Sequence, residues 1–134
     1  MAFFEWCQLQ SSVIPELKLL FHVPNGGMRP QRVDAKGRTY SVEALKLKKM
    51  GVRKGVLDYF LPVPRMVMNV WRAGLLIEFK AKDGKMSDEQ REFAGAVEQQ
   101  GYVVLVVNDW EAAKNYVVQY LGFPEAAVIN GRKQ

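Results

Sequence analysis

The sequence predicts a single mixed α/β domain, with a central β-sheet flanked by helices. The chain has 134 residues, 49% of them hydrophobic, which is enough to bury one core and leaves no length for a second. Segments with helical periodicity alternate with short apolar segments rich in β-forming residues. Glycine and proline occur singly between these segments, and no internal repeat or low-complexity tract is present.

The N-terminal part is expected to form a helix and then a strand. Residues 3–11 have a helix-favouring composition, and Pro15, which lacks a backbone N–H, predicts a break or a restart between residues 12 and 15. The stretch "LLFHV" at residues 19–23 is short and apolar enough for a strand. "PNGG" follows it as a turn signal, because it is too short for a phosphate-binding Walker loop.

Two strands are predicted in the middle of the chain, after a short helix. Ser41 is suited to cap a helix running to Met50, with Gly51 as the left-handed residue after its last turn. "VLDYFLP" and "GLLIEFKAK" are expected to be neighbouring antiparallel strands. Their connection, residues 62–73, has more Met, Val and Trp than a surface loop usually carries. It either extends the strands into a longer hairpin or forms a dimer contact.

The C-terminal part is predicted to be helix, strand and helix. Ser87 and Gln90 form a capping-box signature, and the helix that they begin should end near Gly101. "YVVLVV" is a continuous apolar run, typical of a strand covered on both faces. Asn108 or Asp109 can cap the last helix. The residues expected to share one face are Gln90, Phe93, Ala94 and Val97 in the helix that follows Ser87, and Trp110, Ala113, Val117 and Tyr120 in the last helix.

Composition also argues against several classes of protein. The lone Cys7 permits no internal disulfide, and no run of about eighteen uncharged apolar residues could span a membrane. "MAFFEWCQLQ" lacks the basic start and cleavage site of a secretory signal, so we expect a cytoplasmic protein. His22 is the only histidine, which argues against a histidine-rich zinc site. We interpret His22 and Cys7 as structural.

Positive charge is concentrated in residues 28–54. The chain carries a net charge of +5, whereas this segment alone holds nine basic and two acidic residues. Such a cluster suits a phosphate backbone, because neutralising phosphates releases counterions, although a solvated basic face is the alternative. The nine basic residues are Arg29, Arg32, Lys36, Arg38, Lys46, Lys48, Lys49, Arg53 and Lys54, and all but Lys48 are predicted nucleic-acid contacts.

Charged residues interrupt the two middle strands. Because strand side chains alternate, Glu78 and Lys80 share one face, while Asp58 is expected on the face of Val56 and Phe60. An unpaired carboxylate is costly among apolar residues, and a bound cation removes that cost. Two carboxylates on adjacent strands can hold Mg²⁺, beside an ammonium that positions a water. A salt bridge between Glu78 and Lys80 at a strand end is the alternative.

Taken in order, "GVRKGVLDYFLP", "GLLIEFKAKDGKMSDEQREF" and "GYVVLVV" resemble the VRR-NUC family, the virus-type replication-repair nucleases of the PD-(D/E)XK superfamily. The resemblance covers most of the chain and implies one VRR-NUC-like domain over residues 1–134, with a restriction-endonuclease-like core. In one departure, Leu57 stands where the family usually has proline before its aspartate. Proline contributes backbone shape and no ligand, so the chemistry is unaffected.

The resemblance also implies roles for individual residues. Asp58 and Glu78 would be ligands of Mg²⁺ or Mn²⁺, with the backbone carbonyl of Phe79, and Lys80 would orient or activate the nucleophilic water. Gln90 matches a helical glutamine that points toward the active site. Glu5 matches an acidic residue of the family's first helix, near the metal centre, and Glu16 is a competing candidate for that role. Asn25 lies in a turn that the family places close to the nucleic acid.

The function that the resemblance implies is metal-dependent endonuclease activity on DNA. Stand-alone phage and bacterial members resemble junction-resolving enzymes and tend to be homodimers, which suits a two-fold symmetric four-way (Holliday) junction and a role in DNA repair in a bacterial or phage-infected cell. Recognition of branched DNA by shape and backbone is expected, because no base-reading element is recognisable. The alternatives are a non-catalytic nucleic-acid-binding module on the same fold and a structural partner protein.

Overall fold

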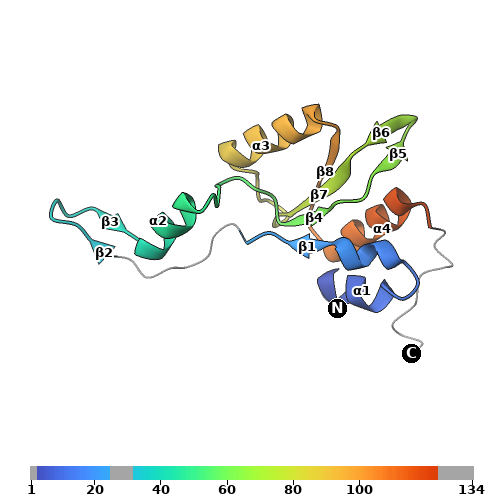
Figure 1. Cartoon of the computed structure of the whole chain (residues 1–134), viewed down its shortest axis with the longest axis horizontal. Coiled ribbons are helices and arrows are strands. Elements are labelled where there is room, and N and C mark those ends of the chain that lie inside the picture. The colour runs from blue at the N-terminus through green and yellow to red at the C-terminus, as the bar shows by residue number, and fades with distance from the viewer. Residues whose placement is uncertain (1–2, 25–31, 124–134) are drawn as a thin grey trace.

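A mixed four-stranded sheet forms the centre of the computed structural model, which describes residues 3–24 and 32–123 (Figure 1). Its strands are β1 (Phe21–His22), β4 (Tyr59–Leu61), β7 (Gly74–Phe79) and β8 (Tyr102–Val107), in the order β1-β4-β7-β8. β4 pairs antiparallel with both β1 and β7, whereas β7 and β8 are parallel. The predicted antiparallel pairing of the two middle strands is therefore confirmed.

Helices cover both faces of this sheet (Figure 1). The helix α3 (Asp88–Gln99) links β7 to β8 and packs on one face, where Leu57, Leu76 and Ala94 form a small core. The opposite face carries α1 (Phe3–Gln10), the 3₁₀ helix η1 (Pro15–Leu19) and α4 (Trp110–Leu121) over a larger core. A parallel pair requires such a crossover connection, so α3 follows from the strand order.

The helix boundaries follow from local signals that the sequence carries. The helix α1 ends at Gln10, and helical structure begins again at Pro15 with η1, as the proline predicts. Ser41 caps α2 (Val42–Lys49) by accepting a hydrogen bond from the Ala44 N–H, at 3.1 Å. At the start of α4 the capping residue is Asp109, so the choice that the sequence left open between residues 108 and 109 is decided.

Two short hairpins lie outside the central sheet. The first, β2 (Arg32–Val33) with β3 (Thr39–Tyr40), was not predicted. The second, β5 (Arg65–Val67) with β6 (Val70–Arg72), forms the connection between β4 and β7. This connection is thus a hairpin, as one of the two alternatives proposed, although it pairs as a separate two-stranded sheet. Residues 68 and 69 at its tip both have positive φ, as a tight hairpin turn requires.

One expectation about the sheet was wrong. The strand β8 is not covered on both faces throughout, because Val106 is 44% exposed and the other residues of the strand are only partly buried. It also lies at an edge of the described sheet. Helices α3 and α4 each cover part of it. Across the described parts of the chain, no helix combines the length and the hydropathy needed to cross a membrane.

Candidate active site

Two carboxylates meet where β4 begins and β7 ends. The pairing of Tyr59 with Ile77 brings Asp58 beside Glu78, and each binds backbone of the neighbouring segment. The Asp58 N–H donates to Glu78 Oε1 at 3.2 Å, and the Phe79 N–H donates to Asp58 Oδ2 at 2.9 Å. Asp58 itself lies at a bend before β4, not within a regular strand as the alternation assumed.

Two further side chains converge on the second oxygen of Glu78. Lys80 Nζ lies 3.2 Å from Glu78 Oε2, and Gln90 Nε2 donates to the same oxygen at 2.8 Å. The Gln90 amide also completes the capping box of α3, because its Oε1 accepts a hydrogen bond from the Ser87 N–H at 2.9 Å. One side chain therefore fixes the start of α3 and joins that helix to the carboxylate pair.

Burial governs the electrostatics of this cluster. Glu78 is 3% exposed, and its pKa is raised above the ordinary value because burial disfavours the charged carboxylate. The nearby charge of Asp58 raises the pKa further, whereas hydrogen bonds from Lys80 and Gln90 and the charge of Lys80 oppose the shift. The upward shift means that ionised Glu78 is incompletely compensated by these protein groups.

This shift predicts how the stability of the metal-free protein depends on pH. Because the folded pKa of Glu78 lies above the unfolded one, the folded state binds the proton more tightly. The resulting stability is fully present below the ordinary pKa of 4.5 and is lost as pH rises through the raised folded value. In EDTA, wild type should therefore gain more stability than Glu78→Gln on acidification from neutral pH towards that range. Urea titrations at a series of pH values measure the difference, and identical profiles would contradict the shift.

The donor set fits a hard divalent cation. Carboxylate oxygens suit Mg²⁺ or Mn²⁺, and Mg²⁺ usually keeps several waters while using one or two carboxylates. Within residues 3–24 and 33–123, no three His, Cys, Asp or Glu side chains gather closely enough to hold a metal. Asp58 and Glu78 are therefore a two-carboxylate set, and the backbone of Phe79 lies beside them.

Comparison with known proteins identifies the fold of the chain. No family model and no curated protein matches the sequence. A solved structure described as "VRR_NUC domain protein" is similar over 91% of this chain and 93% of that chain, with a TM-score of 0.58 and 20% sequence identity. The chain has the VRR_NUC fold. The fold that the ordered motifs implied is thus confirmed, while the roles of the site residues stay predictions.

Within the VRR_NUC fold of this chain, four of the predicted catalytic residues come together and one does not. Asp58, Glu78, Lys80 and Gln90 share direct contacts. Glu5 is exposed on α1 and forms no acidic cluster with the pair in the described structure. Its competitor Glu16 is held by Arg65, whose Nη2 lies 2.6 Å from Glu16 Oε2. Neither glutamate is placed as a third ligand.

An open hollow adjoins the cluster on the side of α3. Its lining residues are Lys54, Gly55, Lys80, Ser87, Glu89 and Gln90. Gly55 has a φ of +86°, and a Cβ built there would lie 2.5 Å from the carbonyl oxygen of Glu89. The absence of a side chain at Gly55 therefore lets the segment before Asp58 approach the first turn of α3. No pattern in the sequence signals this contact of Gly55 with α3.

His22 has a contact with the site that the sequence did not suggest. Its Nδ1 donates to the carbonyl oxygen of Asp58 at 2.9 Å, and its ring contacts that of Tyr59. The Val23 N–H donates to the same carbonyl at 2.7 Å. The edge strand β1 thus holds the backbone of Asp58 in place, so interpreting His22 as structural agrees with its contacts.

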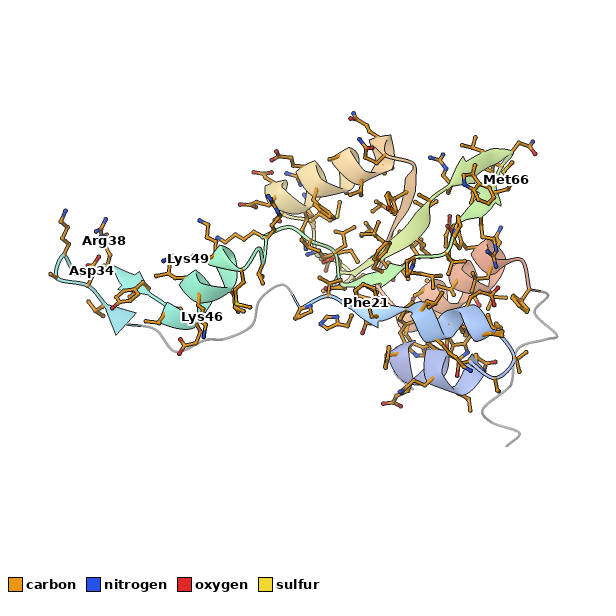
Figure 2. All side chains as sticks on the ribbon, in the orientation of Figure 1. Phe21, Asp34, Arg38, Lys46, Lys49 and Met66 are labelled. Carbon is orange, nitrogen blue, oxygen red and sulfur yellow. The ribbon has the colours of Figure 1, made fainter. Side chains whose placement is uncertain are left out.

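The predicted nucleic-acid contacts lie mainly on an extension of the fold, here called the basic arm. This arm comprises residues 32–54, with β2, β3 and α2, and it projects away from the sheet and its covering helices (Figure 1). No residue of α2 is buried, and Lys46 and Lys49 extend from it (Figure 2). The exposed cations of the arm are Lys36, Arg38, Lys46, Lys48, Lys49, Arg53 and Lys54.

The far end of the arm is ordered by its own polar contacts. Asp34 accepts hydrogen bonds from the backbone N–H groups of Lys36 and Arg38, and its second oxygen lies 2.9 Å from Arg38 Nε (Figure 2). These bonds lower the pKa of Asp34, the Arg38 backbone bond contributing most. Among the predicted contacts, Asn25 and Arg29 lie outside the described residues, and only the backbone of Arg32 is described.

Proposed function

We propose that this protein is a metal-dependent endonuclease that hydrolyses phosphodiester bonds in DNA. The observation that carries the proposal is the convergence of Asp58, Glu78, Lys80 and Gln90, in which two carboxylates, an ammonium and an amide are in direct contact. The similarity of the fold to a solved structure described as "VRR_NUC domain protein" adds support.

The chemistry assigns a task to each side chain. Asp58 and Glu78 would hold Mg²⁺ or Mn²⁺ through carboxylate oxygens, with the carbonyl of Phe79 as a further donor. A bound divalent cation supplies polarisation of the phosphodiester and a lowered pKa for an attacking water. Lys80, whose side chain is 23% exposed, can reach that water or the charge developing on the phosphate. Gln90 keeps the Glu78 carboxylate in position.

The basic arm supports nucleic acid as the substrate. Its exposed cations adjoin the site through Arg53 and Lys54, four to five residues before Asp58 along the chain. Lys54 also lines the hollow beside Lys80 and Gln90, so positive charge continues from the arm to the carboxylate pair. A DNA backbone bound along this path would pass over Asp58 and Glu78, with affinity that falls as salt rises.

Branched DNA is the proposed substrate, and cleavage of defined substrates tests it. An end-labelled four-way junction, its matching linear duplex and the component single strands are incubated with Mg²⁺, Mn²⁺ or EDTA. We expect paired cuts in the junction, dependent on either metal and much slower in the duplex. Binding to the junction without cutting in any metal would instead indicate the non-catalytic module.

A homodimer is the proposed assembly, because it would present two sites to a two-fold symmetric junction. The β5–β6 hairpin offers an uncovered apolar surface, formed by the exposed side chains of Met66, Met68, Val70 and Trp71. Large exposed apolar surfaces commonly mark interaction sites.

Trp71→Asp should weaken that dimer by at least about ten-fold, since a charge in place of an aromatic anchor of the interface removes a dominant contact. Sedimentation velocity of both proteins over a concentration series measures the change. Leu45→Asp is the matched control, because Leu45 is also exposed but lies on α2 in the basic arm, outside the hairpin. A monomeric wild type, or an unchanged dimer in Trp71→Asp, would contradict the assignment of this surface.

A further inference from the structure

An aromatic row crosses the sheet on the face that carries Glu78. The Phe21 ring contacts that of Phe60 at 5.7 Å with an interplanar angle of 72°, and Phe60 contacts Tyr102 at 5.9 Å. The last two rings meet across Gly74, where a Cβ would lie 3.2 Å from both of them. Phe60 and Tyr102 are partly buried with the core beneath α3, whereas Phe21 is 47% exposed. The row therefore ends in a braced and accessible ring.

Phe21 lies two residues along the chain from a contact with the Asp58 backbone. It is on the edge strand β1 and pairs with Phe60, while Val23, two residues further on, donates its N–H to the Asp58 carbonyl. Two residues along a strand correspond to about 7 Å. Glu78 shares its face of β7 with Leu76, which packs in the same core as Phe60. The accessible ring and the Glu78 carboxylate thus face the same side of the sheet.

The charge around the site identifies the ligand that such a ring would meet. The basic arm and Lys54 supply cations for a phosphate backbone, and Phe21, on the edge strand β1 outside the arm, offers an aromatic surface (Figure 2). Proteins that bind single strands combine these two features, because bases stack on aromatic side chains while cations follow the backbone. Fully paired duplex offers no such base, since its bases are stacked on one another.

We infer that Phe21 stacks against an unpaired nucleobase next to the scissile phosphate and thereby selects DNA with a single-stranded or branched region at the cut. This inference rests on the proposed function and names the feature by which the site would distinguish its substrate. Stacking is tolerant of base identity, because every base has a π-face. Selection would therefore act on DNA structure, with little dependence on sequence.

The test compares Phe21→Ala, Phe21→Leu and Phe21→Trp with wild type on a branched DNA and its linear duplex. Binding in EDTA is followed by fluorescence anisotropy, and cleavage is followed in Mg²⁺. We expect Phe21→Ala to lose about ten- to a hundred-fold in affinity and in kcat/KM for the branched DNA, with a much smaller loss on the duplex. Trp should restore both quantities, whereas Leu, which is apolar but not aromatic, should not.

An abasic nucleotide placed in turn at each position beside the cut provides the complementary change. At one position it should reproduce the loss in wild type and add little in Phe21→Ala, because the same contact is removed twice. Equal affinity and cleavage in wild type and Phe21→Ala, rescue by Leu as complete as by Trp, or a change in oligomeric state in Phe21→Ala would overturn the inference. Thermal unfolding of each variant identifies losses caused by misfolding.

The stacking role of Phe21 and the nuclease activity can fail independently of each other. Wild type that cuts branched DNA, beside a Phe21→Ala variant that behaves identically, removes the stacking role and leaves the nuclease intact. Wild type that cuts nothing in either metal removes the proposed function, and the EDTA binding measurements still decide whether Phe21 contacts a base.

Discussion

Replacing Lys80 with alanine is expected to lower the rate of DNA cleavage by about two to four orders of magnitude while the protein stays folded. The ammonium lies 3.2 Å from Glu78 Oε2 and is the cation in direct contact with the carboxylate pair. Its side chain is partly exposed, so truncation opens no core cavity. Single-turnover cleavage of a labelled junction measures the rate, and circular dichroism checks the fold.

Two variants make the Lys80 result specific. Lys80→Met keeps the length of the side chain without its charge, so it should be as inactive as Lys80→Ala if the ammonium is what matters. Lys82→Ala removes an exposed lysine two residues further along and should cleave at nearly the wild-type rate. Full activity in Lys80→Ala would remove the mechanism proposed for this residue.

The largest effect on stability is expected from Gly55→Ala. Alanine at a φ of +86° is strained, and its Cβ would lie within 3 Å of the backbone of Glu89. The first turn of α3 must move to relieve this contact. We expect a loss of about 2–5 kcal/mol in the free energy of unfolding, measured by urea titration.

The chain offers a matched control for Gly55→Ala. Gly95 lies within α3, and a Cβ there meets nothing within 4 Å, so Gly95→Ala should raise stability by about 0.5–1 kcal/mol. Because Glu89 precedes Gln90, Gly55→Ala should also slow cleavage in whatever fraction remains folded. Equal stability of the two variants would show that the segment before Asp58 does not approach α3 as described.

Much of the site could be predicted because its geometry follows from short-range rules. Strand alternation is enough to place Glu78 and Lys80 on one face, and they form an ion pair there. The Ser87 and Gln90 spacing is enough to predict the capping box, and the amphipathic stripe directs Gln90 inward, where it reaches Glu78. The Glu78–Lys80 and Ser87–Gln90 relations involve residues two and three positions apart, so neighbouring sequence determines them.

Relations between distant segments could not be predicted in this way. The contact between Gly55 and Glu89 joins segments that no pattern links. The apolar run of β8 indicates a strand but not its number of neighbours, so its edge position came only from the structure. The tip of the β5–β6 hairpin has Met68 at positive φ, where a glycine would have given a turn signal. The exposed position of Glu5 likewise depends on how α1 packs.

Asp58 and Glu78 are proposed to hold a divalent cation together. Isothermal titration calorimetry of Mn²⁺ into wild type, Asp58→Asn and Glu78→Gln tests it without any assumption about substrate. We predict saturable binding to wild type at neutral pH, weakened by at least about ten-fold in each variant, since each loses a charged oxygen ligand. Equal Mn²⁺ binding by wild type and both variants, or no binding by wild type, would contradict a cation site formed by Asp58 and Glu78.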